Sequence, residues 1–550
     1  MSGAIPENPP PPRVTRLLEL AAAVVSARDA LTTARDALLS APTRSPASAA
    51  LADAIDGEAR GLAEFLSGVY RLVELAEDSW DDLDGPDPVD EPERVRLRES
   101  LDRAVDNAFV DLARLTGASA AAGPQPPGPG PTVFPGAGID TRATVEAWAR
   151  AEPAEVYSTV EHMDTADRRV LALAEPEIVG GTYGVPWAVR ARANAVAVRR
   201  ALHREQLAGT PWSPRIGRLE TMARRAGRRR RSFIAFSPRR GGRMIEVVGE
   251  PGPGTDAIAV YVPGTGTNLD MSHVNTDVVE DFVEAGGGRL VAVAYLDGEF
   301  PQDIMADAGR PHFAEAMAPR LVRFCREVDR VMEIECPGAE LTVLGHSYGG
   351  RIVGTAEWLG LRADRVVYAE SPDLGVGVAG PADWRSPGPV RRFSFTAPGD
   401  PVELLQVRFG LRRRWSVSDL SDGAVRLDTG YFADTGHHDD DNPGHPELVY
   451  GTRGHGGVFD RDCGAFRAML AVMLGGPAPL WREREVRARH TRIRRGEEGR
   501  MLPVIRRHAA GLWLKRADQP YAEPEVLWEA PERTIDIPAP RGGGAGQARK

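Results

Sequence analysis

The stretch LTVLGHSYGGRIVG, residues 341–354, places Ser347 between two glycines at the spacing G-x-S-x-G. Because glycine is abundant in this chain, with 59 in 550 residues, the motif alone says little. The branched apolar run before it is typical of a buried strand, and the segment after it is compatible with a helix. This context indicates a nucleophile on a sharp strand-to-helix turn, whose strained backbone requires small neighbours. The amide of Tyr348, at the start of that helix, is then a predicted donor to a developing oxyanion.

A second oxyanion donor is expected from the loop after the strand at 257–262. There the sequence reads VYVPGTGTN, residues 260–268, and we predict the amide of Thr265 as this donor. The flanking glycines allow a substrate to approach the backbone closely. The stretch contains no G-K-[ST] sequence, so a phosphate-binding loop is not expected.

The general base must be a histidine late in the chain, because this architecture orders its triad as Ser, then Asp, then His. His455 lies in GTRGHGGVFD, a glycine-rich stretch read as a loop, directly before an apolar helical segment. We predict His455 as the base, with His445 and His438 of the cluster HHDDDNPGH (437–445) as alternatives. That cluster also has side chains that could bind a divalent cation, but its spacing fits no metal-binding loop, and a solvated acidic loop is favoured.

Two aspartates are candidates for the acid that orients the base. Asp400 follows the expected strand at 392–396 in FSFTAPGDPVEL, and Asp373 follows the preceding strand in AESPDLG. An acid at either position can reach the histidine in this architecture, and we favour Asp400. A turn aspartate before proline would explain the same composition at Asp400.

The elements around these residues alternate between strands and helices. Continuous apolar runs predict strands at 232–236, 244–248, 257–262, 290–296, 341–345, 365–370 and 392–396. From residue 257 onward the runs are separated by helix-length segments. This alternation predicts an α/β fold with a mostly parallel central sheet covered by helices on both faces.

The ends of the chain differ from this central part. Helical periodicity over residues 13–115 predicts a small bundle that serves packing or partner binding. A Pro/Gly-rich stretch at 117–138 reads as a linker, and residues 141–208 look helical again. Residues 479–550 read as an Arg-rich extension that ends in a disordered tail.

The overall composition limits the function classes. A net charge of −10 and a pI near 5.7 argue against a nucleic-acid binder, and the arginine run at 224–231 has no interleaved aromatics. Three cysteines give neither a disulfide framework nor a zinc signature. No stretch approaches the roughly 20 apolar residues of a membrane span, and no secretory signal is visible. We therefore expect a cytoplasmic protein.

Six ordered landmarks, VPGTGTN, LDGEFPQD, VLGHSYGG, ESPDLG, APGDPV and HGGVFD, resemble those of the α/β-hydrolase family of unknown function DUF1023, found mainly in actinobacteria. The helical string PEIVGGTYGVPWAVRARAN (176–194) resembles that family's lead-in, so the resemblance spans 140–478. It implies an α/β-hydrolase domain with Ser347 as nucleophile, Asp400 as acid and His455 as base. The chain departs from the family where a serine and an aromatic residue are expected after the histidine.

These observations predict a serine hydrolase that cleaves an ester or another acyl bond of a small-molecule substrate through an acyl-enzyme intermediate. The predicted chemistry needs no metal or organic cofactor. The alternative is a non-catalytic binding or scaffold protein that acts through its helical bundle. Some relatives carry helices akin to substrates of a leaderless secretion system, so export by that route is the alternative to a cytoplasmic location.

Overall fold

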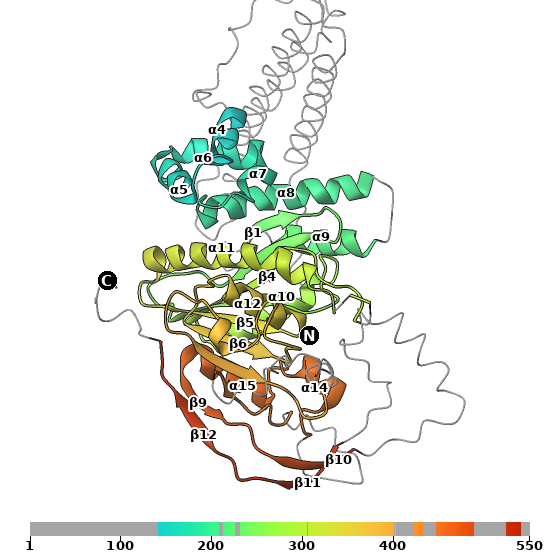
Figure 1. Cartoon of the computed structure of the whole chain (residues 1–550). Coiled ribbons are helices and arrows are strands. Elements are labelled where there is room, and N and C mark those ends of the chain that lie inside the picture. Colours follow the sequence, from blue (N-terminus) through green and yellow to red (C-terminus); the bar gives the residue numbers. More distant parts are fainter. Residues whose placement is uncertain are drawn as a thin grey trace, which may run out of the picture. The chain divides into compact units, whose positions relative to one another are not determined.

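The computed structural model describes residues 141–207, 213–225, 231–304, 306–307, 309–400, 402, 423–432, 447–488 and 524–540. The predicted bundle (13–115), the predicted linker (117–138) and the loop with His438 and His445 lie outside these residues. The chain divides into two compact units, Met1–Val196 and Ala197–Lys550 (Figure 1). This boundary falls inside the helix Trp187–Leu207, which was expected to belong with the hydrolase domain. The predicted domain limits, 140–478, therefore stay a prediction.

The described part of the first unit is helical, as the sequence predicts. It contains α4 (Thr141–Trp148), α5 (Pro153–His162), α6 (Thr165–Ala174), α7 (Pro176–Val179) and the start of α8 (Trp187–Leu207). Their apolar faces share one core, which includes Val145, Trp148, Val156, Val160, Leu171 and Val179. The side chains of Arg190 and Asn194 both donate to the carbonyl oxygen of Gly180, at 3.2 and 3.0 Å. The string 176–194 therefore folds back on itself.

In its described residues, the second unit is built on one eight-stranded sheet. Its strands are β1 (Arg231–Ser237), β2 (Arg243–Val248), β3 (Ala257–Val262), β4 (Leu290–Leu296), β5 (Glu340–His346), β6 (Arg365–Ala369), β7 (Arg391–Phe395) and β8 (Val425–Arg426). Their order is β1-β2-β4-β3-β5-β6-β7-β8. The β1–β2 and β2–β4 pairs are antiparallel and the remaining neighbours are parallel. All seven predicted strands and the mostly parallel sheet are confirmed.

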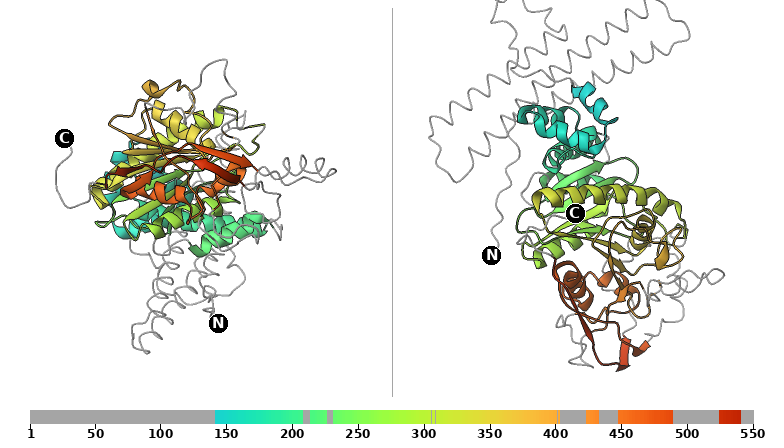
Figure 2. Two further views of the ribbon diagram at one scale, coloured as in Figure 1. Left: turned by 90° about the horizontal axis from the view of Figure 1, so that it is seen from below. Right: turned by 60° about the vertical axis from the view of Figure 1, so that its left-hand side comes forward.

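Helices lie on both faces of this sheet (Figure 2). They are α9 (Pro214–Arg225), α10 (Ser272–Ala285), α11 (His312–Glu335), α12 (Tyr348–Trp358), α14 (Gly451–Gly457) and α15 (Gly464–Leu474), with a short 3-10 turn at Pro381–Asp383. The rings of Phe282 on α10 and Phe466 on α15 stack at 4.5 Å, so these two helices pack together. Burial from both sides explains why every residue of β3 and β4 is buried and why both strands are continuous apolar runs. Among the described residues, no helix has both the length and the apolar character to cross a membrane.

The described part of the C-terminal region contains four strands, where none was predicted from the sequence. β9 (Gly476–Pro479) pairs with β12 (Thr534–Ile537), and β10 (Arg484–Ala488) pairs with β11 (Pro524–Glu529), shown in red in Figures 1 and 2. The buried guanidinium of Arg365 on β6 donates to the carbonyl oxygen of Pro538 at 2.8 Å and to Glu340 at 2.9 Å. The first part of the extension is therefore tied to the central sheet, and residues 541–550 of its tail lie outside the described residues.

Candidate active site

Ser347 occupies a sharp turn between β5 and α12. Its φ and ψ are 53° and −123°, a backbone conformation that L-residues with a side chain adopt only at a cost. A Cβ atom at Gly345 would lie 2.7 Å from the carbonyl oxygen of Gly349, and one at Gly349 would lie 2.0 Å from that of Val262. Only glycine fits at both flanking positions, which is the crowding that the motif predicts.

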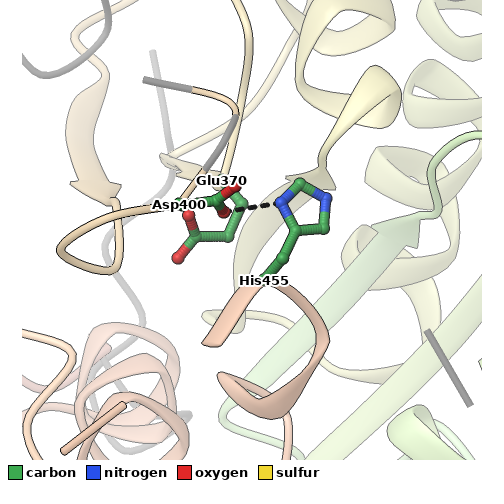
Figure 3. A group of neighbouring side chains, drawn as sticks. All are labelled: Glu370, Asp400 and His455. Carbon is green, nitrogen blue, oxygen red and sulfur yellow. Dashed lines mark hydrogen bonds and ion pairs between the residues drawn. The ribbon is translucent and has the colours of Figure 1, made fainter. Parts of the chain in front are cut away.

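His455 and Asp400 are bonded to each other. Nδ1 of His455 lies 2.6 Å from Oδ2 of Asp400, and both side chains are buried (Figure 3). Burial raises the pKa of Asp400, but the adjacent His455 and the hydrogen bonds to the carboxyl group outweigh it, so the pKa lies below its ordinary value. The ionised carboxylate accepts the Nδ1 proton, which leaves the Nε2 lone pair of His455 for a reacting group.

The expectation that His455 lies in a loop was wrong. His455 belongs to the seven-residue helix α14, in which the amide of Gly454 donates to the carbonyl of Tyr450 at 2.8 Å. Glycine has low helix propensity, so local sequence favours a loop here. Packing decides otherwise, because a Cβ atom at Gly454 would lie 2.7 Å from Cβ of Ala397 and glycine alone lets the helix approach this closely.

The end of β5 contacts α14 directly. Nε2 of His346, the residue before Ser347, lies 2.9 Å from the carbonyl oxygen of His455. Burial and the neighbouring His455 lower the pKa of His346 to about 3, so its imidazole is neutral. Because a carbonyl only accepts, Nε2 of His346 carries the proton and donates it. The predicted base is therefore held by its backbone next to the turn that carries Ser347.

The two segments with predicted oxyanion donors both adjoin Ser347. Tyr348 follows it as the first residue of α12. A Cβ atom at Gly264 would lie 2.7 Å from Cβ of Ser347 and 3.2 Å from its Oγ, so the chain passes directly against the serine one residue before Thr265. The amide of Gly266 donates to the carbonyl of Pro301 at 2.7 Å, which holds this loop in place.

Asp373, the alternative acid, has other partners. One of its carboxylate oxygens accepts the amide of Gly375 at 2.9 Å, and the other lies 3.5 Å from Nε of Arg351 on α12. The structure thus bonds His455 to Asp400 and turns Asp373 toward α12. The alternative bases His438 and His445 lie outside the described residues.

Glu370 is a site residue that the sequence analysis did not identify. It directly follows β6, has a φ of 52°, and is fully buried. Its Oε1 accepts the amide of Ala397 at 2.8 Å, and an oxygen of its carboxyl group lies within 4.8 Å of one of Asp400. Figure 3 shows it beside Asp400. A signal was available, because Glu370 is an acidic residue at the carboxyl end of a buried parallel strand, where ligand-binding groups gather.

Glu370, Asp400 and His455 each offer one ligand atom, and these atoms lie within 4.8 Å of one another, close enough to hold a metal ion. The direct bond between His455 and Asp400 already uses Nδ1 and Oδ2, however. His455 and Asp400 are therefore bonded to each other, and this arrangement suits a hydrogen-bonded base and acid.

Residues 237–409 match the model of a family described as Alpha/beta hydrolase. Together with the strand order, this match identifies the sheet and its helices as an α/β-hydrolase fold. No curated protein matches the chain.

Several solved structures are similar to part of the chain. A dienelactone hydrolase from Anabaena variabilis is 16% identical, with 36% of this chain and 88% of that one covered and a TM-score of 0.24. Esterase PE8 is 16% identical, with coverages of 33% and 86% and a TM-score of 0.25. An arylesterase is 12% identical, with coverages of 42% and 88% and a TM-score of 0.24. Likeness at this level does not indicate which reaction the chain performs.

Proposed function

We propose that this chain is a serine hydrolase that cleaves an ester or another acyl bond of a small-molecule substrate. The observation that carries the proposal is the 2.6 Å bond between His455 and Asp400. It holds the imidazole in the tautomer of a general base. The bond from His346 holds the backbone of the same histidine next to Ser347.

The reaction follows from these positions. Oγ of Ser347 attacks the acyl carbonyl carbon while Nε2 of His455 takes its proton, and Asp400 stabilises the imidazolium. The amides of Tyr348 and Thr265 donate to the carbonyl oxygen as it becomes negative. Collapse expels the alcohol or amine, which receives the proton from His455. Water, activated by the same histidine, then releases the acid and restores the serine.

Membership of the DUF1023 family, with a hydrolase domain over 140–478, is part of the same proposal. Its support is that the landmarks far apart in sequence adjoin one another. A Cβ atom at Gly350 of VLGHSYGG would lie 2.3 Å from Oγ of Ser371 in ESPDLG. The landmarks APGDPV and HGGVFD supply Asp400 and His455, and Gln302 of LDGEFPQD donates to the carbonyl of Thr267 at 2.8 Å.

A fluorophosphonate probe tests the proposal, because it reacts covalently with an activated serine. We expect the wild-type protein to be labelled and Ser347→Ala to remain unlabelled. Ser371→Ala is the matched control, because its hydroxyl lies beside the same turn but donates to the carbonyl of Asp373 at 2.8 Å. Labelling should persist in that variant. A series of p-nitrophenyl esters of graded acyl length would then define the substrate class.

Absence of labelling in the folded wild-type protein, together with no ester hydrolysis, would reject the hydrolase. It would favour the alternative of a binding or scaffold protein on the same fold.

A further inference from the structure

The turn after β6 places the side chain of Glu370 in the interior, beside Asp400. Glu370 is one of three described non-glycine residues with positive φ, together with Ser347 and Arg240. Its amide donates to the carbonyl of Phe395 at 2.9 Å, which ties the end of β6 to the end of β7. Such strained conformations gather at functional sites, and here the strain places a carboxyl group with no exposure to solvent next to the acid of the site.

The closeness of the two buried acids locates a proton on this pair. Asp400 accepts the amide of Val402 on Oδ1 at 2.8 Å and Nδ1 of His455 on Oδ2 at 2.6 Å. Glu370 accepts the amide of Ala397 on Oε1. An oxygen of the Glu370 carboxyl group also lies within 4.8 Å of one of Asp400, and both side chains are buried. Two ionised carboxylates this close would repel each other strongly, so one of the two carries a proton and can donate it to the other.

The charge belongs on Asp400. Two adjacent carboxylates that are both buried cannot readily ionise together. Asp400 faces His455, which becomes positive when it takes a proton, and His346 lies beyond, with its ring centroid 5.0 Å from that of His455. The acid that faces the base keeps its negative charge, and the acid behind it takes the proton.

We infer that Glu370 is a neutral carboxylic acid that donates a hydrogen bond to Asp400 and fixes the orientation of that carboxylate toward His455. It is a positioning residue, since it acts on the base only through Asp400. Its effect on rate depends on the proposed hydrolase function, whereas its protonation does not.

Two substitutions separate this role from a merely structural one. In Glu370→Gln the amide oxygen can accept from Ala397 and the amide nitrogen can donate to Asp400, as the acid does. In Glu370→Leu neither bond forms. We expect kcat to stay within about threefold of wild type in Glu370→Gln and to fall about 10- to 100-fold in Glu370→Leu, with KM changed little, because a hydrogen bond to a charged group is lost. Asp373→Asn, in the same loop but with its carboxylate held by the amide of Gly375 and by Arg351, is the control and should keep wild-type kcat.

The proton itself is tested by infrared spectroscopy, which does not require activity. Wild-type protein at neutral pH should show the carbonyl stretch of a buried carboxylic acid, and Glu370→Gln should lack that band. Asp373→Asn should retain it. If Glu370→Leu does not fold, the band and the Glu370→Gln kinetics still decide the question.

Several results would overturn the inference. A missing acid band, combined with Glu370→Gln as slow as Glu370→Leu, would mean that Glu370 acts as a carboxylate. Wild-type kcat in folded Glu370→Leu would remove the positioning role. A missing band whose absence is reversed by a chelator, with a change in Tm, would assign a metal ion to the three side chains. If the band is present but the wild-type protein neither hydrolyses esters nor labels, the hydrolase function fails while the protonated pair stands.

Discussion

The imidazole of His346 donates from Nε2 to the carbonyl oxygen of His455 at 2.9 Å, although 109 residues separate the two in sequence. One partner ends the strand before the nucleophile turn, and the other lies in the helix that carries the predicted base. Their bond fixes the backbone of the base relative to the residue beside Ser347. The alignment of serine and histidine therefore depends on a side chain outside the proposed triad.

Removing this bond should slow the reaction. In His346→Phe the ring is kept but the donor is lost, and we expect kcat to fall about fivefold because a neutral hydrogen bond is lost. His346→Gln can donate again and should recover part of the rate. Stopped-flow or plate assays with a p-nitrophenyl ester measure this effect. Equal rates in all three proteins would show that the contact does not align the base.

The same histidine should make stability depend on pH. Its pKa is about 3 in the folded protein against an ordinary value of 6.5. Between these two pH values His346 is therefore protonated in the unfolded chain and neutral in the folded one. Stability is therefore full above pH 6.5 and decreases as pH falls, by at most about 1.4 kcal/mol per pH unit for this one group. Urea unfolding between pH 7 and 4.5 should show a shallower loss in His346→Gln. Parallel curves for the two proteins would contradict the assignment.

Replacing the orienting acid should leave the fold and remove most of the activity. Asp400→Asn keeps the shape of the side chain, but its amide nitrogen can donate to Nδ1 and so stabilise the wrong tautomer of His455. A decrease in kcat of about 10³- to 10⁴-fold is expected, with near-normal circular dichroism. The control Asp373→Asn should retain activity. The reverse ranking of the two variants would move the acid to Asp373.

The loop with Thr265 should tolerate no side chain at Gly264. A Cβ atom there would meet Ser347 at 2.7 Å, so Gly264→Ala must push the loop and its amide donor away from the serine. We expect kcat/KM to fall about 100-fold, as for loss of an oxyanion donor. Gly254→Ala is the matched control, because nothing lies within 4 Å of its added Cβ. Similar activity in both variants would place the oxyanion donors elsewhere.

The buried Arg365 should be essential for stability. It bonds to Glu340 and to the carbonyl oxygens of Val472 and Pro538, so Arg365→Met leaves a carboxylate and two carbonyls without this donor. A loss of about 3–5 kcal/mol in the free energy of unfolding is expected, with faster proteolysis of the C-terminal strands. Arg391→Met, the register neighbour on β7 with an exposed side chain, should be nearly neutral. Equal stability of the two variants would show that the anchor contributes little.

Local sequence was sufficient to predict those elements whose conformation depends on neighbouring residues in the chain. A strand buried on both faces must be a continuous apolar run, so β3 and β4 were predicted at their exact limits. A strained turn needs glycine on both sides, so Ser347 could be placed between β5 and α12. The mostly parallel sheet followed from the alternation of strands and helices.

Tertiary packing decided what depends on residues distant in sequence. Asp400 and Asp373 both follow strands, and only the paths of their loops decide their partners. Asp400 is bonded to His455, 55 residues further along, and Asp373 lies near Arg351. The glycines around His455 suggested a loop, but close approach to Ala397 made them a helix. Glu370 was predicted as the end of a strand, but the turn that follows β6 places its side chain beside Asp400. The C-terminal strands pair with partners that are far apart in sequence. Neither strand pairing nor side-chain proximity over such distances can be predicted from the short-range pattern of a sequence.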